Sequence, residues 1–143
     1  MWLRFLETKA EWGTLPIRLV LATIFIAHGS QKLFGLFGGH GLLGTAQFFQ
    51  TQLGFTPGIL WATLAACGEF FGGLMILFGL ATRLGAFLIS VVMVVAIVSV
   101  HLKNGLFLPG GMEFALVNLG AALALTVLGG GEFSVDEMIA GKD

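Results

Sequence analysis

Long apolar stretches, separated by short polar or glycine-rich connections, dominate this chain. Several approach the length of about 20 mostly apolar residues that a helix needs to cross a bilayer. A spanning segment must satisfy its backbone hydrogen bonds internally, so we expect each of them to be a helix. The predicted spans are residues 15–37, 57–81, 83–101 and 112–128. The pattern therefore predicts an all-α, polytopic membrane protein: a four-transmembrane-helix bundle forming a single domain over residues 1–143.

Composition strengthens this prediction. Hydrophobic residues make up 57% of the chain and charged residues only 10%, whereas a soluble domain carries about a quarter charged residues. A soluble fold of 143 residues would leave much of this apolar surface in water. The expected location is the cell membrane, as a multi-pass protein, most simply a prokaryotic cytoplasmic (inner) membrane. The seven Lys and Arg residues are scattered, so no basic patch indicates nucleic acid as a partner.

The span boundaries carry capping signals. Thr56 precedes Pro57, which predicts an N-cap followed by a proline at the first helical position. Thr82 is the predicted cap of the third span. Ser134 and Glu137 have the spacing of a capping box, which predicts one short helical turn at the surface with no chemistry of its own.

The connection over residues 38–56 is long for so small a protein and mixes apolar with polar side chains. It predicts a short helix from about Thr45 to Leu53, lying in the outer membrane interface. A re-entrant segment is the alternative.

Positive charges predict the orientation, because Lys and Arg concentrate on the cytoplasmic side. With four spans, both termini are predicted to be cytoplasmic. That side would hold Arg4, Lys9, Arg18, Arg83 and Lys142, and the outer side Lys32 and Lys103. The first apolar stretch is too long for the hydrophobic region of a signal peptide and lacks a clear cleavage site, so we expect a retained span.

Ionisable residues fall inside the predicted spans, where each costs roughly 2.5–3.5 kcal/mol on insertion scales. At a rise of about 1.5 Å per residue, His28 lies about 13 Å below the outer end of the first span. Glu69 lies about 18 Å below the outer start of the second span by the same measure. Lys32 is one turn above His28. These three residues are therefore predicted to meet near mid-membrane.

Helical geometry places the same residues on packed faces. His28 and Lys32 are an i,i+4 pair. Glu69 adjoins the pattern Gly68-x-x-x-Gly72, which lets helices approach closely, so Glu69 is predicted to pair with Lys32 or His28. The candidate ligand-binding or proton-handling residues are His28, Lys32, Glu69, His101 and Glu113. The last two are predicted to close the outer end of the cavity, and no residue is assigned as catalytic.

Structural roles compete with this hypothesis. Buried polar groups can simply hold helices together, at about 0.6 kcal/mol per hydrogen bond. Arg18 and Arg83, at the inner ends, are expected to snorkel to the interface. Cys67 is the only cysteine, which excludes an internal disulfide and a Cys-based metal cage; we interpret it as a small buried apolar residue. No metal site is predicted.

Several motifs, in order along nearly the whole chain, resemble the DoxX family of small four-helix integral membrane proteins. They are the runs Arg18 to Gly39, Gly68 to Gly73 and Gly79 to Arg83, then His101, Gly110 to Glu113 and the tail from Gly129 to Asp136. The resemblance implies a four-helix membrane protein. The family is named for a small subunit of an archaeal thiosulfate:quinone oxidoreductase. Other members are linked to membrane-associated oxidoreductase complexes and oxidative-stress responses.

The first functional hypothesis is a membrane subunit of an oxidoreductase system that binds quinone or a similar lipophilic ligand in a polar intramembrane cavity. His28 and Lys32 would donate to a carbonyl, and Glu69 would hold a proton. The expected apolar lining is Phe25, Phe34, Phe70 and Trp61. The sequence has no haem-like or flavin-like motif, so no covalent cofactor is predicted. A soluble or membrane redox partner would supply the electrons.

Two other functions remain open from the sequence. A cluster of ionisable residues at mid-membrane also suits a proton-coupled transporter or small-solute pathway. Four helices form a thin channel, so this function would favour a homo-oligomer. The third hypothesis is a non-catalytic scaffold or assembly partner, in which the cluster only holds the helices together. Whether the chain is an enzyme is not decided by these motifs, because none completes a catalytic constellation.

Overall fold

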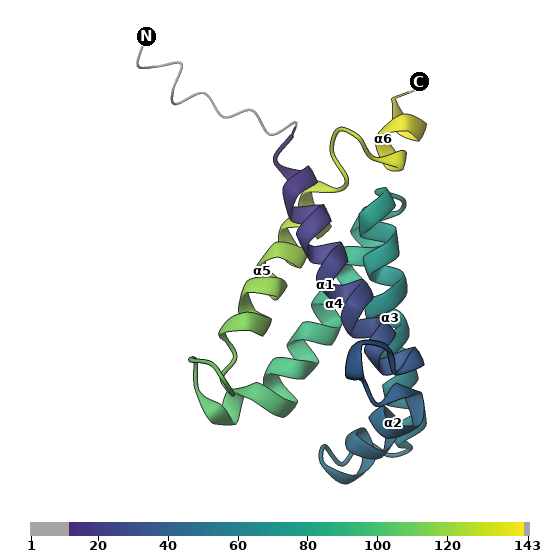
Figure 1. Cartoon of the computed structure of the whole chain (residues 1–143). Coiled ribbons are helices and arrows are strands. Elements are labelled where there is room, and N and C mark those ends of the chain that lie inside the picture. The colour runs from purple at the N-terminus through teal and green to yellow at the C-terminus, as the bar shows by residue number, and fades with distance from the viewer. Residues whose placement is uncertain (1–11, 142–143) are drawn as a thin grey trace.

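Apolar helices joined by glycine-rich connections build the described part of the chain, residues 12–141 of a computed structural model (Figure 1). The elements are α1 (Thr14–Phe34), η2 (Leu36–Gly38), α2 (Gly41–Thr51), α3 (Gly58–Phe78), α4 (Thr82–Ala96), η3 (Ile97–His101), η4 (Leu102–Asn104), α5 (Glu113–Leu128) and α6 (Val135–Ala140). No strand occurs among these residues, which confirms the all-α prediction for them.

Close packing of α1 on α3 organises the molecule, while α4 packs on α3 and α5, and α2 lies against the beginning of α3 (Figure 1). Small residues allow the close approach of α1 and α3. A Cβ atom on Gly29 would lie 2.6 Å from the backbone nitrogen of Phe70, and one on Gly73 would lie 2.9 Å from Cγ1 of Ile26. The largest buried apolar side chains are Leu21, Phe25, Ile76, Ile89 and Leu125.

Two helical elements are long and apolar enough to cross a membrane: α3, and the 23-residue run Thr82–Asn104 that joins α4 with η3 and η4. The pair Thr14–Phe34 and Leu36–Thr51 passes the same criterion jointly, but it is bent by 96°. The apolar helix α5 is shorter, at 16 residues. Among the described residues, length and composition therefore identify two candidate spanning helices, or three if the bent pair is one span.

Several predicted boundaries need correction. The first helix ends at Phe34 rather than at 37, because Gly35 takes a left-handed conformation (φ 71°) and closes it. Pro57 is the N-cap residue of α3 and not its first helical residue. Ala81, rather than Thr82, is the cap position of α4. The helix predicted within residues 38–56 is present as α2, beginning at Gly41.

The C-terminal segment folds back over the end of the bundle where α1 begins (Figure 1). Ser134 accepts a hydrogen bond from the backbone of Glu137 at 3.1 Å, as the predicted cap requires. The segment nevertheless does more than form a surface turn. The two carboxylate oxygens of Asp136 accept hydrogen bonds from the backbone N–H groups of Ala81 and Thr82, at 2.7 and 2.8 Å. Asp136 thus satisfies donors at the start of α4 that have no partner within the helix.

Arg18 is not an exposed anchor, and the snorkelling prediction is wrong: only 1% of the residue is exposed. Its guanidinium donates to the backbone carbonyls of Ile76 and Leu77, at 2.9 and 3.0 Å. It also donates to the carbonyls of Gly130 and Phe133, at 3.1 and 3.2 Å. The last carbonyls of α3 lack partners within their own helix, and the five donors of arginine match this need. Arg83 is exposed, and Arg4, Lys9 and Lys142 lie outside the described residues.

We expect the Asp136→Asn variant to be less stable than the wild type at neutral pH by about 1 kcal/mol, because the amide of asparagine keeps only one acceptor oxygen for the two backbone N–H groups and carries no charge. Burial raises the pKa of Asp136, but hydrogen bonds from Thr82 and Ala81 and the charge of Arg18 outweigh it, so the pKa lies below its ordinary value. The carboxylate therefore stabilises the fold above its unfolded pKa of about 3.9. That contribution disappears as the pH falls through the lower folded pKa.

Melting curves of both proteins in detergent, recorded from neutral pH to about pH 3, test this expectation. The difference between them should narrow on acidification. The Glu132→Gln variant is the control, because Glu132 is exposed in the same segment. If the difference in melting temperature between the wild type and Asp136→Asn stays constant with pH, the proposed role of the Asp136 charge is wrong.

Candidate functional site

An ion pair with a buried carboxylate and a partly exposed ammonium group joins the first two long helices, α1 and α3. Nζ of Lys32, in the last turn of α1, lies 2.5 Å from Oε2 of Glu69, in the middle of α3. The side chain of Glu69 is only 4% exposed and that of Lys32 is 27% exposed. The close approach of α1 and α3 at Gly29 brings the two residues within reach. Of the two partners predicted for Glu69, the structure selects Lys32.

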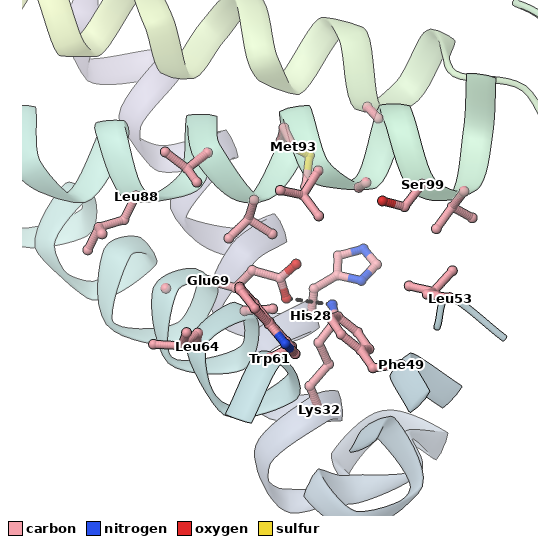
Figure 2. Close-up of a pocket in the computed structure, with 18 of the residues that line it drawn as sticks. His28, Lys32, Phe49, Leu53, Trp61, Leu64, Glu69, Leu88, Met93 and Ser99 are labelled. Carbon is pink, nitrogen blue, oxygen red and sulfur yellow. Dashed lines mark hydrogen bonds and ion pairs between the residues drawn. The ribbon is translucent and has the colours of Figure 1, made fainter. Parts of the chain in front are cut away.

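The ion pair lies on the wall of a cavity of about 640 Å³ between α1, α2, α3, α4 and α5. Most of the lining is aliphatic or aromatic, including Phe25, Phe49 and Trp61. Figure 2 shows the side chains of His28, Lys32 and Glu69 gathered at one side of this space. The site is therefore a mainly apolar chamber with one strongly polar wall.

His28 stands beside the ion pair on the same face of α1, one turn before Lys32 (Figure 2). Within residues 12–141, no hydrogen bond ties its imidazole to another protein group. The ring instead lies 6.4 Å from the ring of Phe114, centroid to centroid. Its nitrogens can therefore donate to, or accept from, a molecule in the cavity.

The two remaining predicted residues, His101 and Glu113, lie in different places. His101 lines the cavity, and its Nδ1 donates to the carbonyl of Gly110 at 3.2 Å, so only Nε2 is left to interact with an occupant. Glu113 is not part of the lining. Its Oε1 accepts a hydrogen bond from the backbone of Leu108 at 2.7 Å, within the loop before α5. The structure thus brings four of the five candidates to one cavity and places the fifth in the adjoining loop.

The aromatic lining differs in part from the prediction. Phe25 and Trp61 line the cavity, but the rings of Phe34 and Phe70 pack against each other instead, with centroids 5.5 Å apart. Helix α2 and the turn after it contribute residues that the sequence placed at the membrane interface, among them Phe48, Phe49 and Leu53. The apolar positions of that segment were the available signal, and packing against α3 turns them toward the cavity.

Met93 and Ser99 are lining residues that the sequence did not single out (Figure 2). Both lie in an uninterrupted apolar stretch, and nothing in its local pattern distinguishes them. For metal binding, the described part of the chain offers no cluster of three or more His, Cys, Asp or Glu residues. The chemistry that the site can supply is hydrogen bonding from Lys32 and His28 and proton exchange at Glu69.

Comparison with known proteins places this geometry in context. The model of the family described as DoxX matches residues 13–102. A protein of Bacillus subtilis (strain 168) named "Putative oxidoreductase CatD" is 33% identical over 129 residues, which cover 90% of this chain and 88% of that protein. An uncharacterized protein of Haemophilus influenzae is 31% identical over 139 residues, covering 92% and 93% of the two chains. No solved structure matches the chain.

Proposed function

The chain belongs to the DoxX family, and from this premise we propose that it is an integral membrane subunit of an oxidoreductase system that binds quinone or a similar lipophilic ligand. The binding site is the cavity between α1, α2, α3, α4 and α5. A redox partner holds the electron-carrying cofactor, since the sequence has no haem-like or flavin-like motif. The relative named an oxidoreductase supports this assignment.

The observation that carries the proposal is the single polar wall of the apolar cavity. A quinone has an apolar ring and tail and carbonyl oxygens that accept hydrogen bonds. Lys32 and His28 supply donors, and Glu69 can pass a proton to or from a reduced oxygen. The volume of about 640 Å³ is within the range of about 300–1,000 Å³ of small-molecule sites.

In the membrane, we place α1, α3, the run from α4 through η4, and α5 as four spans of the cytoplasmic membrane. Both termini lie on the cytoplasmic side. The cavity then belongs to the outer half of the bundle, and α2 covers it from the outer interface. The C-terminal segment lies at the end of the bundle where α1 begins (Figure 1). This supports an arrangement in which both termini are on the same side of the membrane.

A melting experiment in detergent tests the proposal. Decyl-1,4-benzoquinone should stabilise the wild-type protein, by about 2.7 kcal/mol at a concentration of 100 times its Kd. His28→Ala should reduce this shift, because it removes a donor from the polar wall. Glu113→Gln is the matched control and should keep the full shift, since Glu113 does not line the cavity. No shift with several quinones, or an equal shift in His28→Ala, would argue against quinone binding.

Proton-coupled transport is the second candidate, and the burial of Glu69 beside Lys32 favours it. Ionisable residues at membrane depth are typical of proton pathways. Proteoliposomes of the wild type would then take up protons or solute, and those of His28→Ala would not. If wild-type vesicles take up neither protons nor solute, and quinone raises the melting temperature of the protein, quinone binding is favoured over transport.

A further inference from the structure

The helix that forms the far wall of the cavity changes its geometry where it passes the site. Residues Ile97–His101 form a π-helical turn that continues α4. Three residues of this turn, Ser99, Val100 and His101, line the cavity. Such turns occur frequently at functional sites.

The hydroxyl of Ser99 does not donate to a carbonyl of its own helix, as several other helical hydroxyls of this protein do. Ser90 donates to the carbonyl of Ala86, four residues earlier in α4, at 2.9 Å. Thr63 and Thr126 donate in the same manner, at 2.7 and 2.9 Å. The side-chain hydroxyl of Ser99 forms no hydrogen bond with any of residues 12–141. Its hydroxyl is therefore available to an occupant of the cavity.

The hydroxyl of Ser99 is a polar group among mainly apolar neighbours on its helix. The part of α4 that precedes it lines the cavity with apolar side chains, including Val92, Val95 and Ala96. Figure 2 shows Ser99 on α4's side of the space, while Lys32 and Glu69 lie on the side formed by α1 and α3. The cavity lining thus includes, besides His28, Lys32 and Glu69, the hydroxyl of Ser99 on the helical turn that continues α4.

We propose that Ser99 is a second binding pole, which hydrogen-bonds the far oxygen of a ring compound whose near oxygen is held by Lys32 or His28. The inference rests on the proposed ligand-binding function and deepens it: the preferred ligands are rings with two oxygens in para positions and an apolar tail. A hydroxyl both donates and accepts, so Ser99 can bind the oxidised and the reduced form of such a ligand. Ser99 acts here as a positioning and specificity residue.

Binding of decyl-1,4-hydroquinone and of the two decylphenols that each lack one of its oxygens tests this proposal. The full-length wild type, Ser99→Ala and Ser99→Thr are compared in detergent. Ser99→Ala should weaken hydroquinone binding about five- to tenfold, the usual effect of one lost hydrogen bond. It should leave the affinity for the phenol that lacks the far oxygen unchanged. Ser99→Thr retains the hydroxyl and should bind the hydroquinone as the wild type does.

Ser90→Ala is the matched control, because Ser90 lies in the same helix but does not line the cavity. It should bind all three ligands as the wild type does. Equal weakening of all three ligands by Ser99→Ala, or no weakening of any, would overturn the role of Ser99 while leaving wild-type binding intact. Failure of the wild type to bind the hydroquinone and the quinone would instead overturn the proposed function, and this inference with it.

Discussion

Replacing Arg18 with methionine should destabilise the folded protein by about 3 kcal/mol or more, one of the two largest effects expected of a single substitution in this chain. Hydrogen bonds from a charged donor contribute about 1.5–3 kcal/mol each, and unpaired buried acceptors add their desolvation cost. The guanidinium of Arg18 donates hydrogen bonds to four backbone carbonyls from two separate parts of the chain. Methionine keeps the apolar stem but leaves all four carbonyls without this partner.

Arg18→Lys should recover only part of the loss. A lysine ammonium has three donors on a flexible stem, whereas the planar guanidinium has five in a fixed arrangement. Unfolding of the variants in detergent or mixed micelles, followed by circular dichroism, measures these differences. Arg83→Met is the matched control, because Arg83 is exposed at the same end of the molecule. If Arg18→Met and Arg83→Met are equally stable, the four hydrogen bonds do not stabilise the fold as argued.

The second large effect is expected at the ion pair. Removing one partner of a buried pair costs about 3–5 kcal/mol, because the other charge is left uncompensated. Lys32→Met should be more damaging than Glu69→Gln. Glu69, at 4% side-chain exposure, would be left unpaired inside the bundle, whereas Lys32, at 27%, is more accessible. The double variant should be more stable than the sum of the two single effects predicts.

A double-mutant cycle of stability and quinone binding measures both consequences. If the pair only holds α1 and α3 together, the double variant should regain stability and still bind quinone. Under the proposed function, it regains stability but loses binding, since Lys32 no longer donates. Glu113→Gln again serves as the control outside the cavity. Strictly additive effects of the two single substitutions on stability would show that the contact carries no coupling energy.

Much of the site could be predicted because its residues are recognisable from local rules. An ionisable residue within an apolar stretch is conspicuous, and spacing by one helical turn puts His28 and Lys32 on one face. Small residues around Glu69 indicated a packed face, and the structure places its carboxylate against Lys32. Glu113 looked equivalent to His101 by depth alone, but the loop before α5 engages its carboxylate. The position of a residue along a helix does not predict whether a neighbouring loop will hydrogen-bond its side chain.

The apolar stretches and the sites of their glycine and proline breaks were enough to determine where the helices form, because backbone hydrogen bonds within a helix join neighbours in the sequence. They also indicated as candidates His28, Lys32, Glu69 and His101, four residues that line the cavity. Only the tertiary structure decided that Arg18 is buried, that Asp136 caps α4, and that a π-helical turn presents Ser99. Their surroundings come from segments distant in the chain, such as Gly130 for Arg18 and Ala81 for Asp136. A buried donor takes the unpaired acceptor that packing brings near it, and local sequence does not encode which one that will be.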